Sequence, residues 1–175
     1  MRITSGIYKG RTLKRVSSND TRETADKVKQ AMFNMLFDVT DKVVLDIFSG
    51  SGQIGFEAIS RGARHVIAID RQKEAIMTIL DNAMMLGCQK KMTLIEHDIS
   101  LKNFPLITQA IDIIIMDPPY DYASYEDLLL KLPQAQDVII ETSKHTNLMN
   151  EIGSYVLKKE KIYGKKKLFY YQLKS

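Results

Sequence analysis

Residues 42–63, KVVLDIFSGSGQIGFEAISRGA, decide the fold of this 175-residue chain. The short β-branched apolar run at 42–48 predicts a buried strand, and an apolar helical pattern follows it that Gly62 would end. Between them, GSGQIG at 50–55 is a literal G-x-G-x-x-G, whose glycines let a ligand approach the backbone near a helix N-terminus. A strand, a glycine loop and a helix in this order are typical of α/β folds that bind nucleosides or nucleotides.

Outward from this unit, apolar strands alternate with helical segments. Strands are expected at 65–70, 92–98, 111–117 and 137–142, helices at 24–37, 73–87 and 124–132, and a short or irregular helix at 100–110. The tail at 155–173 indicates two strands joined near Gly164, and 2–16 indicates a hairpin or extended arm. This order predicts right-handed βαβ units in a doubly wound, Rossmann-like α/β fold. Its sheet would be mostly parallel and seven-stranded, with an antiparallel C-terminal strand.

The composition excludes several classes of protein. No apolar run approaches the ~20 residues that span a bilayer, and the first ten residues lack the apolar core of a signal peptide, so we expect a cytoplasmic protein without a membrane partner. The single cysteine, Cys88, excludes an intramolecular disulfide, and the three isolated histidines argue against a metal site. We expect one domain, with an arm and helix over 1–38 and a core over 42–175.

Positive charge gathers at the two ends of the chain. Residues 1–29 carry eight Lys/Arg against three Asp/Glu, and residues 158–175 carry seven lysines against one glutamate. The middle carries ten basic and 17 acidic residues. Two basic ends on an acidic body suit a polyanion such as nucleic acid, although lysines kept for solubility would give the same counts.

Two acids beside the glycine loop indicate which ligand it holds. Asp70 ends the second predicted strand 20 residues after Gly50, where a carboxylate can bond both hydroxyls of a ribose. Asp46 would repel a pyrophosphate but would attract an ammonium or sulfonium group, and S-adenosylmethionine carries both. A phosphate-binding NTPase loop would need Gly-Lys-Ser/Thr, which is missing here. A nicotinamide dinucleotide stays possible by pattern, and Asp46 could instead cap a local turn.

Residues 117–120, DPPY, end the fourth predicted strand at the same rim of the sheet. The Asp117 side chain and the Pro118 carbonyl can accept the two hydrogens of an exocyclic base amine, which favours a pyramidal and more nucleophilic nitrogen. Pro118 and Pro119 restrict the backbone, so both acceptors would be preorganised. Tyr120 would stack on the target base, a contact worth ~1–3 kcal/mol. Two prolines could also simply terminate the strand.

Several stretches together resemble the RsmD family of class I S-adenosylmethionine-dependent methyltransferases, over essentially the whole chain. They are MRITSGIYKGRTLK, TRETADKVKQAMFNML, LDIFSGSGQIGFEAISRGA, MDPPY, IIE and YGKKKLFYY. The resemblance implies a single methyltransferase domain that methylates the 2-amino group of a specific guanine in bacterial small-subunit (16S) ribosomal RNA. The substrate would be an assembled or assembling subunit, and we expect a monomer.

The resemblance also assigns roles to residues. Cofactor contacts fall on Asp46, Phe48, Gly50, Ser51, Gly52, Gly55, Asp70, Arg71, Asp98 and Ile99. Asp98 would hold the adenine amino group, although an ordinary helix N-cap suits it equally. RNA contacts fall on Arg2, Arg11, Lys14, Arg15 and Arg22. The family usually has proline at Glu23 and arginine at Lys27, which puts the RNA contact there in doubt.

Three other functions fit parts of this pattern. A DNA adenine or cytosine amino-methyltransferase would use the same acid-Pro-Pro-aromatic motif, but 175 residues leave no target-recognition domain. A non-catalytic RNA-binding module for ribosome assembly would not need the intact DPPY set. A dehydrogenase lacks an evident acid/base residue for hydride transfer.

Overall fold

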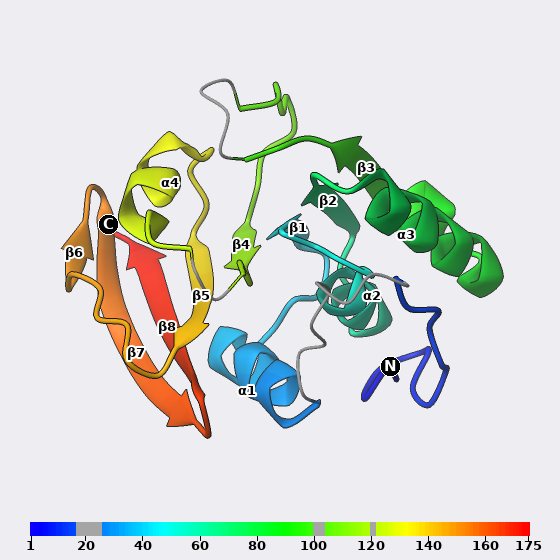
Figure 1. Ribbon diagram of the computed structural model, residues 1–175, viewed down its shortest axis with the longest axis horizontal. Coiled ribbons are helices and arrows are strands. Elements are labelled where there is room, and N and C mark those ends of the chain that lie inside the picture. The colour runs from blue at the N-terminus through cyan, green and yellow to red at the C-terminus, as the bar shows by residue number, and fades with distance from the viewer. Residues whose placement is uncertain (17–25, 100–103, 120–121) are drawn as a thin grey trace.

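A mixed eight-stranded sheet organises the computed structural model, which describes residues 1–16, 26–99, 104–119 and 122–175 (Figure 1). Its strand order is β3-β2-β1-β4-β5-β8-β7-β6. The strands from β3 to β5 pair in parallel, whereas β8 is antiparallel to β5 and β7. The bounds are β1 (Val43–Ile47), β2 (His65–Asp70), β3 (Met92–Glu96), β4 (Ile113–Met116), β5 (Asp137–Ser143), β6 (Glu151–Ile152), β7 (Tyr155–Tyr163) and β8 (Lys166–Leu173).

The predicted fold class is confirmed, with two differences in detail. The sheet gains an eighth strand, because β6 pairs with β7 over only two residues, too few for a sequence pattern. The helix expected at 100–110 is wrong for residues 104–110, which have no helical structure. Pro105 offers a reason, since proline removes a backbone donor and disfavours helix in the residue before it. Residues 100–103 lie outside the described part of the chain.

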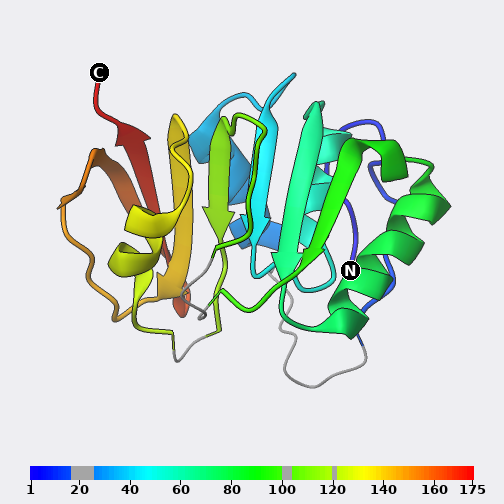
Figure 2. The same cartoon turned by 90° about the horizontal axis from the view of Figure 1, so that it is seen from above.

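Helices cover both faces of the sheet, as parallel strands require (Figure 2). The bounds are α1 (Asp26–Leu36), α2 (Gln53–Ser60), α3 (Lys73–Leu86), a 3₁₀ turn η1 (Gln89–Lys91) and α4 (Tyr125–Lys131). Buried side chains of α1, α2 and α3 form one core cluster with Val44, Ile115 and Ile139 of the sheet. Buried side chains of α4 form a second cluster with Leu45, Ile47 and other strand residues on the opposite face. The two faces are called the α1–α3 face and the α4 face below.

The N-terminal arm docks beside α2 and α3 (Figure 1). An antiparallel bridge joins Arg2 to Thr12, which bears out the hairpin prediction in a short form. Ile3 and Leu13 are buried in the cluster on the α1–α3 face. The arm is therefore part of the core and not a free extension.

A buried ionic cluster fixes this docking. Glu57 of α2 and Lys29 of α1 both have 0% exposed side chains, with 3.2 Å between Lys29 Nζ and Glu57 Oε2. The Thr4 backbone N–H and hydroxyl donate to Glu57 at 2.9 and 2.7 Å, and Arg61 Nε donates at 3.0 Å. Burial raises the pKa of Glu57, but the Thr4 bonds, the Lys29 charge and the Arg61 bond outweigh it, so that pKa is lowered overall. The cluster joins the arm, α1 and α2.

Candidate cofactor and base site

The loop between β1 and α2 has the backbone that its glycines predict. Gly50 and Gly52 have φ of 52° and 77°, in the left-handed region that glycine adopts without strain. A Cβ on Gly52 would lie 2.9 Å from Ile79 Cγ1 and from Phe56 Cε2, so a side chain there cannot be accommodated without a shift. Phe48, which has a side chain, also has φ of 64°, a conformation uncommon outside glycine and enriched at functional sites.

Asp46, in β1, is a buried carboxylate with one unsatisfied oxygen. Its exposed fraction is 0%, and its Oδ2 accepts the Gly55 backbone N–H at 3.1 Å. Its Oδ1 has no hydrogen-bond partner among the described residues. Burial raises the pKa of Asp46 to about 8, with the negative charges of Asp117 and Asp70 adding to the rise and the Gly55 bond opposing it. The turn-capping alternative accounts for Oδ2 but leaves Oδ1 without a role.

Asp70, the last residue of β2, holds the glycine loop against the next turn of the chain. Its Oδ2 accepts the Gly50 N–H at 2.8 Å, and its Oδ1 accepts the Gln72 N–H at 2.9 Å. Each carboxylate oxygen has further lone pairs, so these bonds leave capacity for ribose hydroxyls. Arg71 follows with an exposed side chain, in reach of solvent at the rim.

The remaining predicted cofactor residues divide into two environments. Ser51 is bonded to the arm, because its hydroxyl accepts the Val16 N–H at 3.1 Å. Asp98 and Ile99 follow β3 at the same end of the sheet. Asp98 is half-buried, and Ile99 is 9% exposed and packs in the cluster on the α4 face.

The predicted catalytic residues follow β4 directly. The Asp117 backbone N–H lies 3.5 Å from the Ile47 carbonyl, and its side chain is half-buried. Pro118 is half-buried and Pro119 is exposed, so the motif opens toward solvent. The Pro119 carbonyl accepts the Tyr122 N–H at 3.0 Å. Tyr120 lies outside the described residues.

Tyr122 is a site residue that the sequence reading missed. Its ring packs edge-on against Phe48, with centroids 5.3 Å apart, and against Tyr125 of α4 at 5.2 Å. Tyr122 is half-buried and packs against the cluster on the α4 face. The second tyrosine of DPPYDY was the available signal, and its ring joins the loop after β4 to the glycine loop.

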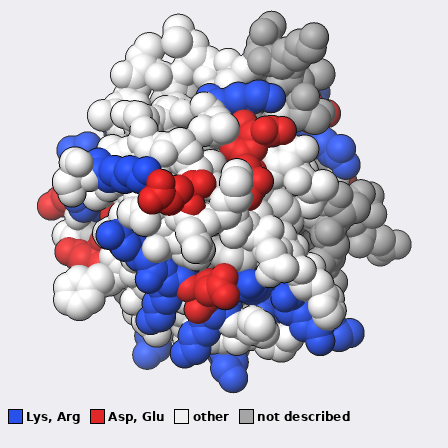
Figure 3. All heavy atoms as spheres, turned by 90° about the vertical axis from the view of Figure 1, so that its left-hand side faces the viewer, with Lys and Arg blue, Asp and Glu red and all other residues white. Residues whose placement is uncertain are grey.

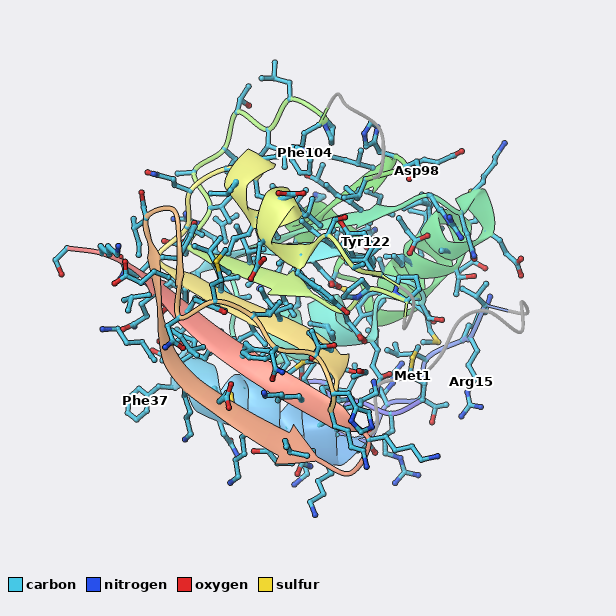
Figure 4. All side chains as sticks on the ribbon, turned by 60° about the vertical axis from the view of Figure 1, so that its left-hand side comes forward. Met1, Arg15, Phe37, Asp98, Phe104 and Tyr122 are labelled. Atoms are coloured by element: carbon cyan, nitrogen blue, oxygen red, sulfur yellow. The ribbon has the colours of Figure 1, made fainter. Side chains whose placement is uncertain are left out.

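The predicted RNA-binding residues that the structure describes lie on the arm, whose Val16 N–H bonds to Ser51 of the glycine loop. Arg2, Arg11 and Arg15 are exposed, and Figure 4 shows Arg15 projecting outward. The Lys14 ammonium instead forms a 2.9 Å ion pair with Asp81 of α3. Arg22 and Glu23 lie outside the described residues.

A second basic surface lies on the hairpin of β7 and β8. Its exposed lysines are Lys158, Lys159, Lys161 and Lys165. Figure 3 shows Lys and Arg side chains gathered in one half of this side of the molecule. The hairpin carries the basic C-terminal charge that the sequence indicated.

The carboxylate oxygens at the rim, which accept hydrogen bonds, fit a positively charged nucleoside. Asp46 presents an unsatisfied buried oxygen, and Asp70 has lone pairs to spare. Within the described residues there is no group of three or more His, Cys, Asp and Glu placed to hold a metal ion. No helix in the described part of the chain is long and apolar enough to cross a membrane.

A family model and two curated relatives match this chain over most of its length. The family model "Conserved hypothetical protein 95" matches residues 1–172. The chain is 34% identical over 173 residues to "Putative rRNA methyltransferase YlbH" of Bacillus subtilis, covering 94% of each chain. It is 30% identical to "Ribosomal RNA small subunit methyltransferase D" of Haemophilus influenzae, covering 94% of this chain and 89% of the other.

Solved structures have the same fold over the same length. A putative methylase from Haemophilus influenzae superposes with a TM-score of 0.80 at 27% identity, covering 99% of this chain and 98% of the other. A putative methyltransferase from Escherichia coli superposes with a TM-score of 0.82 at 24% identity, with the same coverage.

Proposed function

Because the chain belongs to the Conserved hypothetical protein 95 family, we propose that it methylates the 2-amino group of a guanine in bacterial small-subunit (16S) ribosomal RNA, with S-adenosylmethionine as methyl donor. One observation supports the chemistry most strongly. Asp46 of β1 pairs in register with Ile115 of β4, two residues before Asp117, so both carboxylates leave neighbouring strands on one face. Burial raises the pKa of Asp46, and the charge of Asp117 adds to that rise. A cation site and an acceptor for an amine therefore share one rim.

The cofactor residues are assigned by their chemistry. When bound, S-adenosylmethionine supplies an electrophilic methyl group on a sulfonium. Asp46 is assigned to the positive charge, because its Oδ1 is desolvated and has no partner among the described residues. Asp70 is assigned to the ribose hydroxyls, and Asp98 and Ile99 to the adenine. Phe48, with its positive φ, and the glycines at 50, 52 and 55 shape the backbone that the nucleoside approaches.

The base residues lie at the tip of β4. Asp117 and the Pro118 carbonyl accept the two hydrogens of the amine, and Asp117 is placed to take the proton that the nitrogen loses on methylation. The prolines keep both acceptors fixed before the base arrives, so little reorganisation is needed during the reaction. Tyr120 is proposed to stack on the base, and the ring of Tyr122, nearby in the sequence, contacts Phe48 and Tyr125.

RNA binding is assigned to the basic surfaces on either side of the sheet. Arg2, Arg11 and Arg15 are exposed on the arm, and Lys158, Lys159, Lys161 and Lys165 are exposed on the β7–β8 hairpin, whereas the ammonium of Lys14 on the same arm pairs with Asp81. The proposal includes 16S RNA within the small subunit or an assembly intermediate as partner. It also includes a monomeric enzyme acting in the cytoplasm.

Transfer of a labelled methyl group tests this function. The protein is incubated with labelled S-adenosylmethionine and, separately, with small-subunit particles, naked ribosomal RNA and DNA, and the nucleosides are then identified. We expect the label in N2-methylguanosine from small-subunit RNA. Label in adenine, or in DNA, would overturn the proposal.

A further inference from the structure

A second buried carboxylate with an unsatisfied oxygen lies at the same end of the sheet. Glu141, in β5, is 3% exposed. Its Oε1 pairs with the Lys166 ammonium of β8, whose side chain is 12% exposed. Its Oε2 has no hydrogen-bond partner in the part of the chain that the structure describes. Nothing in the proposed function so far uses this pair.

The strand register places Glu141 beside Asp117. Met116 of β4 pairs with Ile140 of β5, so Asp117 and Glu141 come one position later on neighbouring parallel strands. Such strands lie about 4.8 Å apart. The side chains of Asp117 and Glu141 therefore start from adjacent backbone positions, one just after β4 and the other on β5.

Alternation along the strands places both side chains on one face. Ile115 and Ile139, two residues earlier on each strand, are both in the cluster on the α1–α3 face. Side chains two apart on a strand share a face, so Asp117 and Glu141 leave the backbone toward that side. Asp46, which pairs with Ile115, lies next to them on β1.

Lys166 reaches the same place from the antiparallel strand. Leu168 pairs with Glu141 in register and is buried on the α1–α3 face, and Lys166 is two residues before it. Its ammonium thus stands beside the Glu141 carboxylate on the same face of the sheet as Asp117, with β5 between β4 and β8. Asp117 and Pro118 are half-buried and Pro119 is exposed, so this edge opens to solvent next to the pair.

The energetics point to a ligand and not to folding alone. A buried carboxylate–lysine pair is often no more stabilising than apolar residues of the same volume, because desolvation offsets the attraction. An unsatisfied buried oxygen adds a further cost. Asp46 has the same unsatisfied state in the proposed cofactor site, two strands away.

Resting on the proposed function, we propose that Glu141 and Lys166 read the Watson–Crick edge of the target base and select guanine. Glu141 accepts the N1–H, and Lys166 donates to O6, while Asp117 holds the neighbouring 2-amino group. Guanine presents these three groups in a row, and unstacked bases are commonly recognised by this edge. Adenine has a lone pair at N1, which would face the carboxylate, and an amino group in place of O6, which would face the ammonium.

A base analogue distinguishes recognition of the base by Glu141 and Lys166 from a purely structural role of this pair. 2-Aminopurine keeps the 2-amino group but lacks N1–H and O6. Small-subunit particles are reconstituted with guanine or 2-aminopurine at the methylated position, and kcat/KM is measured for wild type, Glu141→Gln and Lys166→Met. We expect wild type to prefer guanine by roughly 10- to 100-fold, by analogy with other bidentate base contacts. Each variant should lose most of this preference by methylating guanine more slowly.

The control and the contrary outcomes are set by the same assay. Glu160→Gln removes a carboxylate that pairs with Lys167 at 3.2 Å on the same hairpin, and it should leave the preference unchanged. Variants that slow both substrates equally, or wild type that accepts 2-aminopurine as well as guanine, would overturn the inference without touching the proposed function. Wild type that methylates no guanine would overturn both. The preference of the wild-type enzyme for guanine over 2-aminopurine is measured without any variant. It can therefore contradict the inference even if a variant fails to fold.

Discussion

Two carboxylates with no exposed surface, Asp46 and Glu57, lie in opposite electrostatic surroundings. Glu57 accepts bonds from Thr4 and Arg61 and pairs with Lys29, and its pKa is lowered. Asp46 accepts one backbone bond and faces two other acids, and its pKa is raised to about 8. Glu57 therefore finds all its hydrogen-bond and ion-pair partners within the protein. Asp46 instead has an oxygen that a positively charged ligand could bind.

This difference in electrostatic surroundings distinguishes a region that stabilises the fold from the region proposed to bind ligands and catalyse the reaction. Glu57 joins the arm to α1 and α2 and is satisfied internally. Asp46, Asp117 and Glu141 lie at the carboxyl ends of β1, β4 and β5, and Asp46 and Glu141 each have an unsatisfied oxygen among the described residues. Ligands of open α/β sheets bind at this end.

Removing the amine acceptor should give the largest effect. We expect Asp117→Ala to lower kcat by roughly 100- to 1,000-fold, as the loss of one preorganised electrostatic partner does in other enzymes. The affinity for S-adenosylmethionine should survive, because removing the negative charge of Asp117 removes one of the causes that raise the pKa of Asp46. Single-turnover methyl transfer and calorimetric titration measure the two. Transfer at the wild-type rate would remove Asp117 from the chemistry.

Breaking the buried ionic cluster around Glu57 should lower the free energy of unfolding. It should leave the activity of the molecules that remain folded unchanged. Glu57→Ala leaves the Lys29 ammonium without its buried carboxylate partner, while the Arg2 carbonyl at 2.7 Å and Asp26 at 3.4 Å remain, and the loss of one member of a buried ion pair costs about 3–5 kcal/mol. Urea unfolding measures the change. Asp81→Ala is the matched control, because its ion pair with Lys14 joins the same arm to α3 in an exposed place and should contribute no more than about 1 kcal/mol. Equal losses for the two variants would contradict the distinction.

The ribose assignment predicts a more moderate effect. Asp70→Ala should weaken S-adenosylmethionine binding by roughly 10- to 100-fold, since it removes charged hydrogen bonds and frees the Gly50 and Gln72 amides that shape the loop. Calorimetric titration at fixed pH checks it. Unchanged cofactor affinity would sink the ribose assignment.

The smallest expected effect concerns the basic hairpin. If Lys159 and Lys161 neutralise phosphates, each Gln substitution should reduce the slope of log binding against log salt by ~0.7–0.9. Lys90→Gln, at the other edge of the sheet beside β3, should leave the slope unchanged. A slope identical in all three variants and wild type would remove the hairpin from the RNA surface.

The residues that sequence could place are those with local signals. Asp46, Asp70 and Asp117 each follow or end an apolar run, so their strand ends were predictable from periodicity, and the glycine spacing predicted the backbone of the loop. Lys29 was missed because it lies in an amphipathic helical pattern, and two of its partners, the Arg2 carbonyl and Glu57, are 27 and 28 positions away in the sequence.

The residues that sequence could not place depend on pairing between distant strands. Glu141 becomes a neighbour of Asp117 only through the register of β4 and β5, and of Lys166 only because β8 inserts beside β5. The arm pattern predicted a hairpin, but not that Thr4 would bond to Glu57. Two residues of β6 carry no readable alternation.

The thermal stability of Asp46→Asn tests the central claim most directly. The folded carboxyl has a pKa of about 8 against an ordinary value of 3.8, so folding binds a proton between these values. The stability cost is absent below about pH 4, grows as pH rises and is complete above about pH 8, where it reaches the order of a few kcal/mol. Without cofactor at pH 8.5, Asp46→Asn should therefore melt above wild type, and added S-adenosylmethionine should raise its Tm less than that of wild type. A variant that melts lower than wild type and gains as much from the cofactor would contradict the account.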